Sequence, residues 1–201
     1  MTSLPSPLHL ELDLSEEQFW QLCHRHKDLK FERTASGELI IMTPTGGLTS
    51  GLAKGEALRD RNSDLNFQLR AWNRKYKLGK VFDSSGGFKL PNGADRSPDA
   101  SWVELSRWNS LTRQQQERFV PLCPDFVVEL RSLSDTIKAT QRKMEEYRDN
   151  GAKLGWFIDP QRKVVEIYRL DREVEVLQSP KMVSGEDVLP EFNLDLTEIF
   201  E

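Results

Sequence analysis

The feature that most constrains this chain is a strand-like run with a carboxylate at its centre. Residues 125–131 read Asp-Phe-Val-Val-Glu-Leu-Arg, and aromatic and β-branched side chains dominate the run. Side chains two positions apart share a face of a strand, so Glu129 points the same way as Asp125 and Arg131. The run predicts a strand near the middle of a sheet, where an isolated Glu129 would be costly to bury without a cation.

A helix and a second strand follow this run. Residues 136–150 have a helical pattern, with Ser134 or Asp135 as the N-cap and Gly151 as the stop, and residues 154–159 are apolar and strand-like. A strand-helix-strand unit predicts that the second strand lies parallel to the first. Residues 163–169 and 173–178 alternate apolar and polar side chains and predict a closing hairpin.

The N-terminal half predicts a smaller set of elements. We expect residues 1–13 to be a loose arm, a helix to begin after Ser15, and residues 29–33 and 38–42 to form a hairpin through Ser36-Gly37. A loop at 43–47 precedes a long amphipathic helix, which Gly79 should end.

The middle of the chain predicts three strands at 80–83, 87–90 and 99–104, arranged as an antiparallel meander and followed by a short helix at 112–118. Taken together, the patterns predict an α/β fold with a mixed central β-sheet flanked by helices, preceded by an N-terminal helix and a β-hairpin. We expect residues 1–201 to form a single domain.

Composition sets the class of protein. The 201 residues are 37% hydrophobic and 30% charged, as in soluble globular domains, and no run approaches the roughly 20 apolar residues that a membrane helix needs. The two cysteines are expected to be reduced thiols in a cytoplasmic protein. The net charge of -4 disfavours a general nucleic-acid coat protein, but residues 54–80 carry eight basic against three acidic side chains, and either DNA contact or plain solvation would explain them.

A second acidic residue stands where a neighbouring strand should begin. Asp99 follows Pro98 at the start of the strand predicted at 99–104, so it could approach Glu129 if the two strands are neighbours. Two carboxylates on adjacent strands form a hard-oxygen pocket that suits Mg²⁺. In the structural alternative, Glu129 forms an ion pair with Arg131 or with a basic residue elsewhere, and Asp99 caps a turn.

Lys143 favours the site over the structural alternative. It lies on the helix after the Glu129 strand, one position from the apolar stripe, so its long stem could carry the ammonium to the same pocket. A solvated lysine on the helix surface is the competing interpretation. Zinc is not expected, because none of the three histidines has a cysteine partner at ligand spacing.

Several motifs in one order resemble the Uma family of putative restriction endonucleases, a branch of the PD-(D/E)XK nuclease superfamily. The resemblance covers roughly residues 31–200 and is carried by the segments 42–47, 97–103, 124–132, 143–147, 150–151, 155–160 and 165–169. It implies a restriction-endonuclease-like fold and a metal-dependent endodeoxyribonuclease.

The resemblance also implies roles for single residues. Asp99 and Glu129 match the two metal-ligating acidic residues, and Asp64 matches an acidic residue that the superfamily often places on its first long helix. Arg131 occupies the slot of the family lysine, two residues after Glu129, and arginine cannot act as a base near neutral pH. Lys143 resembles a migrated substitute, so Lys143 and Arg131 both remain candidates for the lysine role.

The resemblance implies Mg²⁺ as the cofactor, with Mn²⁺ as a substitute, and DNA as the substrate. Because Asp125 shares a strand face with Glu129, we expect it to be a supporting acceptor near the site. Cutting both strands of duplex DNA favours a homodimer. Two other functions stay open: a catalytically silent nuclease-fold protein that binds nucleic acid or a protein partner, and an assembly module that pairs through its acidic C-terminal half.

Overall fold

The strand-like run lies at the centre of a six-stranded sheet. In the computed structural model, which describes residues 7–42, 52–133 and 135–201, with 52–59 by their backbone alone, the strand order is β11-β10-β9-β8-β7-β4. Only the β8–β9 pair is parallel. The strands are β4 (Gly79–Asp83), β7 (Ala100–Glu104), β8 (Phe126–Leu130), β9 (Leu154–Asp159), β10 (Val164–Arg169) and β11 (Glu175–Gln178).

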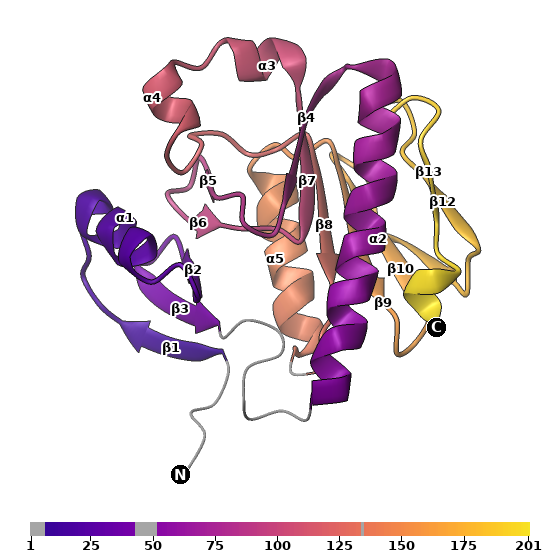
Figure 1. Cartoon of the computed structure of the whole chain (residues 1–201), viewed down its shortest axis with the longest axis horizontal. Helices are drawn as coiled ribbons and strands as arrows, with labels where there is room; N and C mark the ends of the chain where they lie inside the picture. Colours follow the sequence, from indigo (N-terminus) through magenta and orange to yellow (C-terminus); the bar gives the residue numbers. More distant parts are fainter. Residues whose placement is uncertain (1–6, 43–51, 134) are drawn as a thin grey trace.

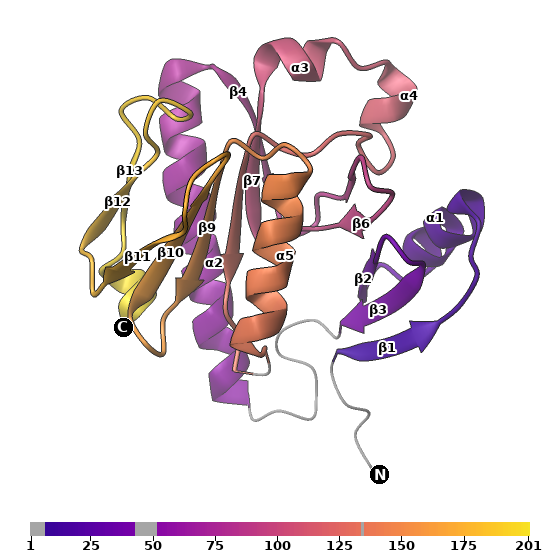
Figure 2. The ribbon, with the colours of Figure 1, turned by 180° about the vertical axis from the view of Figure 1, so that it is seen from behind.

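Helices cover both faces of this sheet (Figures 1 and 2). On one face, Phe126, Val128 and Leu130 of β8 pack in a cluster with Leu65 and Leu69 of the long helix α2 (Leu52–Tyr76). On the other face, Val127 packs with Met144 and Tyr147 of α5 (Ile137–Asp149). The alternation expected for a buried strand therefore holds, and Glu129 lies on the α5 face. The mixed α/β sheet flanked by helices is confirmed.

The predicted crossover is confirmed, with one change at the start of its helix. Strand β9 lies parallel to β8, and Gly151 ends α5 with a positive φ of 102°. The N-cap is Thr136, whose side chain accepts the Ala139 amide, rather than Asp135. Asp135 instead accepts the amide of Ser132, because its side chain closes the preceding turn. The other candidate cap, residue 134, lies outside the described residues.

A second sheet is built from two separate parts of the chain. Its order is β1-β3-β2-β6-β5, with β1 (Leu8–Glu11), β2 (Lys30–Arg33), β3 (Glu38–Met42), β5 (Phe88–Lys89) and β6 (Asp95–Arg96). The expected hairpin of β2 and β3 is confirmed, and Gly37 takes a φ of 91° in its turn.

Two expectations about this region are wrong. The N-terminal arm is not loose over its whole length, because β1 pairs antiparallel with the edge of β3 and Leu10 packs against the small core around Phe19 and Leu39. The three middle strands do not form a meander either. Strands β4 and β7 pair with each other, whereas β5 leaves to pair with β6, since Phe88 is buried in the core on the α5 side.

Two ion pairs of opposite polarity connect β2 to β6. Arg33 lies opposite Asp95 in the register, and a guanidinium nitrogen is 2.7 Å from the Asp95 carboxylate. On the other face, Arg96 reaches back to Glu32 at 3.2 Å. All four side chains are buried, so the contact between the two parts of the second sheet is charged and largely dry.

The helix α2 does not end at Gly79, although the sequence predicted that it would. The helix ends at Tyr76, and Lys77 takes the left-handed conformation with a φ of 57°. Gly79 is instead the first residue of β4, where a Cβ would lie 2.4 Å from the indole of Trp102. The glycine is therefore needed for close packing in the strand rather than for ending the helix.

The remaining elements lie at the edges. Ser15 caps α1 in a reciprocal capping box with Gln18, as expected. The elements not yet given are α1 (Glu16–Arg25), α3 (Leu105–Asn109), α4 (Arg113–Gln116), β12 (Met182–Ser184), β13 (Asn193–Asp195) and the 3-10 turn Glu198–Phe200. The loop expected at 43–47 lies outside the described residues. Among the described helices, none is both long and apolar enough to cross a membrane.

Candidate active site

Asp99 and Glu129 lie side by side at one end of the central sheet. The antiparallel register pairs Ala100 of β7 with Val128 of β8, which makes Asp99 and Glu129 the next residues along the two strands. Both line an open cavity of about 1660 Å³ between the central sheet, α5, α2 and the second sheet. The expected convergence of the two carboxylates on one pocket is therefore observed.

Backbone contacts fix the position of Asp99. One carboxylate oxygen, Oδ2, accepts the amide N–H of Leu130 at 2.9 Å. The other, Oδ1, lies 3.7 Å from the ammonium of Lys30 on β2. Asn66 of α2 donates to the Asp99 carbonyl at 3.2 Å. Asp99 is thus tied to both sheets and to α2, with one oxygen left for a ligand that can displace a loosely held lysine.

Glu129 is a buried carboxylate with a cationic partner. Its Oε1 lies 2.8 Å from the Lys143 ammonium and accepts the Tyr147 hydroxyl at 3.0 Å. Burial and the neighbouring Asp99 charge raise the pKa of Glu129 while Lys143 lowers it, and the net pKa is about 7. The central strand position explains the burial, and burial is the largest cause of the raised pKa.

Lys143 enters the site from α5 and lies between two carboxylates. Its ammonium is 2.8 Å from Glu129 and 2.7 Å from Glu32 of β2. Burial opposes its charge, but Glu129 and Glu32 outweigh burial and raise the pKa of Lys143. The lysine is therefore an ammonium at neutral pH, and the solvated alternative is wrong.

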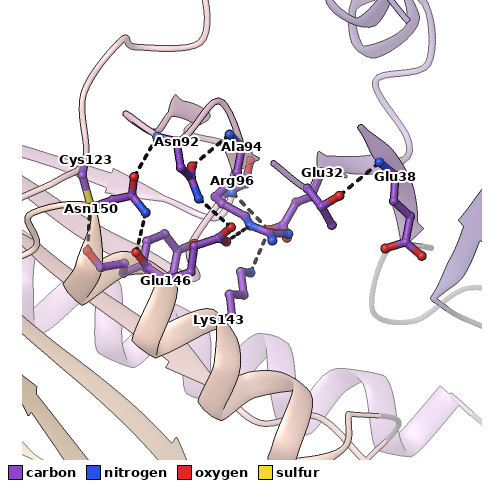
Figure 3. A network of polar contacts seen from close by, with 12 residues as sticks. Glu32, Glu38, Asn92, Ala94, Arg96, Cys123, Lys143, Glu146 and Asn150 are labelled. Atoms are coloured by element: carbon purple, nitrogen blue, oxygen red, sulfur yellow. Dashed lines mark hydrogen bonds and ion pairs between the residues drawn. The ribbon is translucent and has the colours of Figure 1, made fainter. Parts of the chain in front are cut away.

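Glu32, which the sequence patterns do not single out, is central to the polar network (Figure 3). Its carboxylate accepts hydrogen bonds from Lys143, from Arg96 and from the Ser97 amide, and it is 2% exposed. Burial raises its pKa, but the charges of Lys143 and Arg96 prevail and hold the pKa of Glu32 at about 2. The only signal in the sequence was a glutamate between Phe31 and Arg33 in a predicted hairpin.

Arg131 does not reach this cavity. Its guanidinium donates to the Asp159 carboxylate at 2.9 Å and to the Asp135 carbonyl at 3.2 Å. Residue 131 lies beyond the last residue of β8, and Asp159 is the last residue of the parallel neighbour β9, so the two side chains meet at that edge. The structure brings Lys143, not Arg131, to the carboxylates.

Asp64 lies on a different side of α2 from the cavity. Its carboxylate accepts from Gln68, which also contacts the backbone of Asp195 in β13. The cavity is lined instead by Asn62 and Asn66, four residues apart and so on one face of the helix. Two residues correspond to about 200° around a helix, which explains why Asp64 turns away when Asn66 faces the site.

Asp125 lies at the opposite end of β8 from Glu129. Its carboxylate accepts the Glu104 amide at 2.9 Å and lies 2.9 Å from Arg107 and 3.0 Å from Lys153. The expectation that Asp125 supports the site is wrong, because residues four apart in a strand are separated by about 13 Å.

The chemistry of the cavity fits a small divalent cation. Asp99 and Glu129 offer hard carboxylate oxygens, and the ammonium that pairs with Glu129 is shared with a third carboxylate. Among the described residues, no group of three or more acidic, histidine or cysteine side chains could hold a metal ion. A cation here would therefore take two carboxylates from the protein and its other ligands from water and substrate, as Mg²⁺ commonly does.

Comparisons with known proteins identify a family and a similar fold. The model of a family described as "Uma2: Putative restriction endonuclease" matches residues 16–197. Among solved structures, the crystal structure of a putative nuclease belonging to DUF820 from Anabaena variabilis ATCC 29413 is similar, with a TM-score of 0.64 and 20% sequence identity over 85% of this chain and 89% of that chain. At this identity the likeness shows a shared fold. A search of curated proteins found no significant match.

Proposed function

Because the chain belongs to the Uma2 family of putative restriction endonucleases, we propose that it is a divalent-metal-dependent endodeoxyribonuclease. The family and the nuclease-like fold support a nuclease, and the proposal adds DNA as substrate and Mg²⁺ as cofactor, with Mn²⁺ as a substitute. The observation that carries it is the convergence of Asp99, Glu129 and Lys143 on one open cavity.

Asp99 and Glu129 would hold the cation. When bound, it would supply Lewis-acid polarisation of the scissile phosphate and acidify a coordinated water. Asp99 contributes a carboxylate that the Leu130 amide orients. Glu129 contributes one that the Tyr147 hydroxyl orients, and a cation would favour its ionised form over the protonated form that burial favours.

Lys143 would act as a donor rather than as a base. Its raised pKa keeps it protonated, so it can hold a water oxygen or offset charge that develops on the phosphate, but it cannot accept a proton near neutral pH. Arg131 is engaged by Asp159, which supports Lys143 as the substitute for the family lysine.

The direct test is a cleavage assay on supercoiled plasmid and on a linear duplex, with Mg²⁺, with Mn²⁺ and with a chelator. We expect nicks or breaks with either metal, none with the chelator, and none in Asp99→Asn or Glu129→Gln. Cleavage that persists in the chelator, or in both variants at the original rate, would overturn the proposal.

A catalytically silent, nuclease-fold binding protein is the second candidate. The observation that favours it is the position of Lys143, which already bridges the carboxylates of Glu129 and Glu32 and would compete with a metal for Glu129. This candidate predicts DNA binding in a gel-shift assay without metal and no cleavage at any Mn²⁺ concentration.

For cleavage of both strands of a duplex we propose a homodimer acting in the cytoplasm. A two-fold axis presents two copies of one site to the two strands of the duplex, which matches the symmetry of DNA. Sedimentation with and without a short duplex tests the dimer, and a protein that stays monomeric at micromolar concentration in both cases would contradict it.

A further inference from the structure

The network around Lys143 contains a residue that neither the family resemblance nor the proposed mechanism uses. Building on the proposed nuclease function, we propose that Glu32 is a positioning residue that holds the Lys143 ammonium in place beside Glu129 and anchors the strand that leads to Asp99. Among the described contacts, the Glu32 carboxylate binds Lys143, Arg96 and the Ser97 amide rather than Asp99 or Glu129, so it would act through Lys143 and the backbone.

One oxygen of Glu32 makes both connections. Glu32 Oε1 lies 2.7 Å from Lys143 Nζ and accepts the Ser97 amide at 3.1 Å. Ser97 is two residues before Asp99, in the short link between β6 and β7. The same carboxylate therefore sets the position of the donor on α5 and the entry of the chain that carries the first metal-binding carboxylate.

Charge balance gives Glu32 a function that packing alone would not require. With Glu129 as its single anionic neighbour, a buried ammonium would settle into a close pair with Glu129 and so compete with a cation for that carboxylate. A second carboxylate at 2.7 Å shares the ammonium and draws it toward β2. Glu32 thereby leaves Glu129 freer to bind metal while Lys143 stays within reach of the phosphate.

Other contacts already meet the structural needs of this region. The contact between β2 and β6 also contains the Arg33–Asp95 pair, and Arg96 has a second carboxylate partner in Glu146 at 2.5 Å. Figure 3 shows Arg96 between Glu32 and Glu146, with Lys143 approaching Glu32 from α5 below them. Removing the charge of Glu32 therefore leaves the two strands tied together but leaves Lys143 with Glu129 alone.

The test compares Glu32→Gln with Glu166→Gln in the full chain. Glu166 is a matched control because it is also a buried carboxylate that binds an α5 side chain, Gln141 at 3.0 Å, yet it does not line the cavity. Single-turnover cleavage at saturating Mn²⁺ should fall by about 10- to 100-fold in Glu32→Gln and stay within about threefold in Glu166→Gln. DNA affinity should change by less than about threefold in both variants, because neither residue is proposed to contact DNA.

A ¹H–¹⁵N spectrum and a titration of the cleavage rate with Mn²⁺ separate the possible failures. In a ¹H–¹⁵N spectrum of the folded protein, the Lys143 ammonium signal should be visible in the parent protein and in Glu166→Gln but lost to exchange in Glu32→Gln. An unchanged ammonium signal and an unchanged rate in Glu32→Gln would overturn the positioning role. A loss of rate caused by weaker Mn²⁺ binding would also overturn it, because Glu32 would then be a metal ligand.

The spectrum also keeps this inference distinct from the nuclease proposal. If the parent protein cleaves no DNA with either metal, the nuclease proposal fails, while the ammonium signal still decides whether Glu32 holds Lys143. If Glu32→Gln does not fold, Glu32→Asp retains the charge with one methylene less. A partial loss of rate in a folded Glu32→Asp supports the role, and a full rate contradicts it.

Discussion

The two ends of strand β8 carry carboxylates of the same kind in different surroundings. Asp125, at one end, is fully buried and lies between Arg107 and Lys153, two side chains that are themselves half open to solvent. Glu129, at the other end, is buried beside a second carboxylate, Asp99, and faces the cavity. Both side chains point to the α5 face, so the strand pattern alone does not tell them apart.

The difference shows what distinguishes a structural ion pair from a candidate catalytic pair. At Asp125, two cations form ion pairs with one carboxylate, which also accepts a backbone amide. At Glu129, one lysine is shared between Glu129 and Glu32, and burial together with the nearby Asp99 charge raises the pKa of Glu129. A deficit of positive charge beside an open cavity is the property that a metal ion would use.

The largest effect should separate the two ends by activity. Asp99→Asn and Glu129→Gln should each lower single-turnover cleavage by roughly 1000-fold, because a lost metal ligand removes transition-state stabilisation. Asp125→Asn, measured under conditions where it is folded, should cleave at a single-turnover rate within about threefold of the parent protein. A rate loss in Asp125→Asn as large as that in Glu129→Gln would break the comparison.

The next effect concerns the two basic candidates near the Glu129 end. Lys143→Ala should lower the cleavage rate by about 100-fold with DNA affinity nearly unchanged, since it removes a donor aimed at developing charge. Arg131→Ala should instead lower the free energy of unfolding by roughly 1–2 kcal/mol, because it leaves the buried Asp159 with weaker partners. Urea unfolding and single-turnover kinetics on both variants check this, and the reverse pattern would return the lysine role to Arg131.

Stability should show the opposite order from activity. Asp125→Asn should lower the free energy of unfolding by about 2 kcal/mol, because two cations lose a buried anionic partner, although their own exposure to water limits the loss. Asp99→Asn should cost less, since the lysine near it is 3.7 Å away. Thermal or urea unfolding of both variants without metal measures this, and equal losses would contradict the expected order.

The smallest effect is in the pH dependence of metal binding. The pKa of Glu129 in the folded protein is raised to about 7, so below pH 7 the carboxyl group is increasingly protonated and a cation must displace that proton. Mn²⁺ affinity should therefore fall by up to about tenfold per pH unit below 7. Calorimetric titrations from pH 5.5 to 8 test this, with Asp125→Asn as the control, and a flat profile would contradict it.

The same pKa shift has a defined sign for stability. A carboxyl group whose pKa is raised on folding favours the folded state below its ordinary value of 4.5, and that contribution is lost as the pH rises through about 7. As the pH rises from about 4.5 to 7, the free energy of unfolding of the metal-free parent protein should therefore fall relative to that of Glu129→Gln.

The elements that the sequence predicted well are the ones determined by local pattern. The apolar run with Glu129, the helix that carries Lys143 and the parallel strand after it follow from alternation, helical spacing and a glycine stop within some 35 residues. Because Asp99 directly precedes the strand that pairs with β8, the carboxylate pair could also be predicted. The catalytic roles of these residues stay predictions.

The features that it missed depend on contacts between distant residues. Strand β6 has two residues and pairs with a hairpin some 60 positions earlier, which no local pattern encodes. Glu32 lies 111 positions before Lys143, and in the sequence it looks like an ordinary polar residue of a short strand. The orientation of the Arg131 side chain likewise depends on its ion pair with Asp159, at the end of the neighbouring strand.

The way the second sheet is assembled limits how far this protein could be shortened by engineering. Three of its strands precede α2 in the chain and two follow β4, so residues 7–42 look like a detachable N-terminal unit only in the linear sequence. Removing them would leave Asp95 and Arg96 without their partners on β2 and would delete Glu32 and Lys30 from the cavity wall. A shortened form of this chain that keeps the cavity therefore has to retain the hairpin at its N-terminal end.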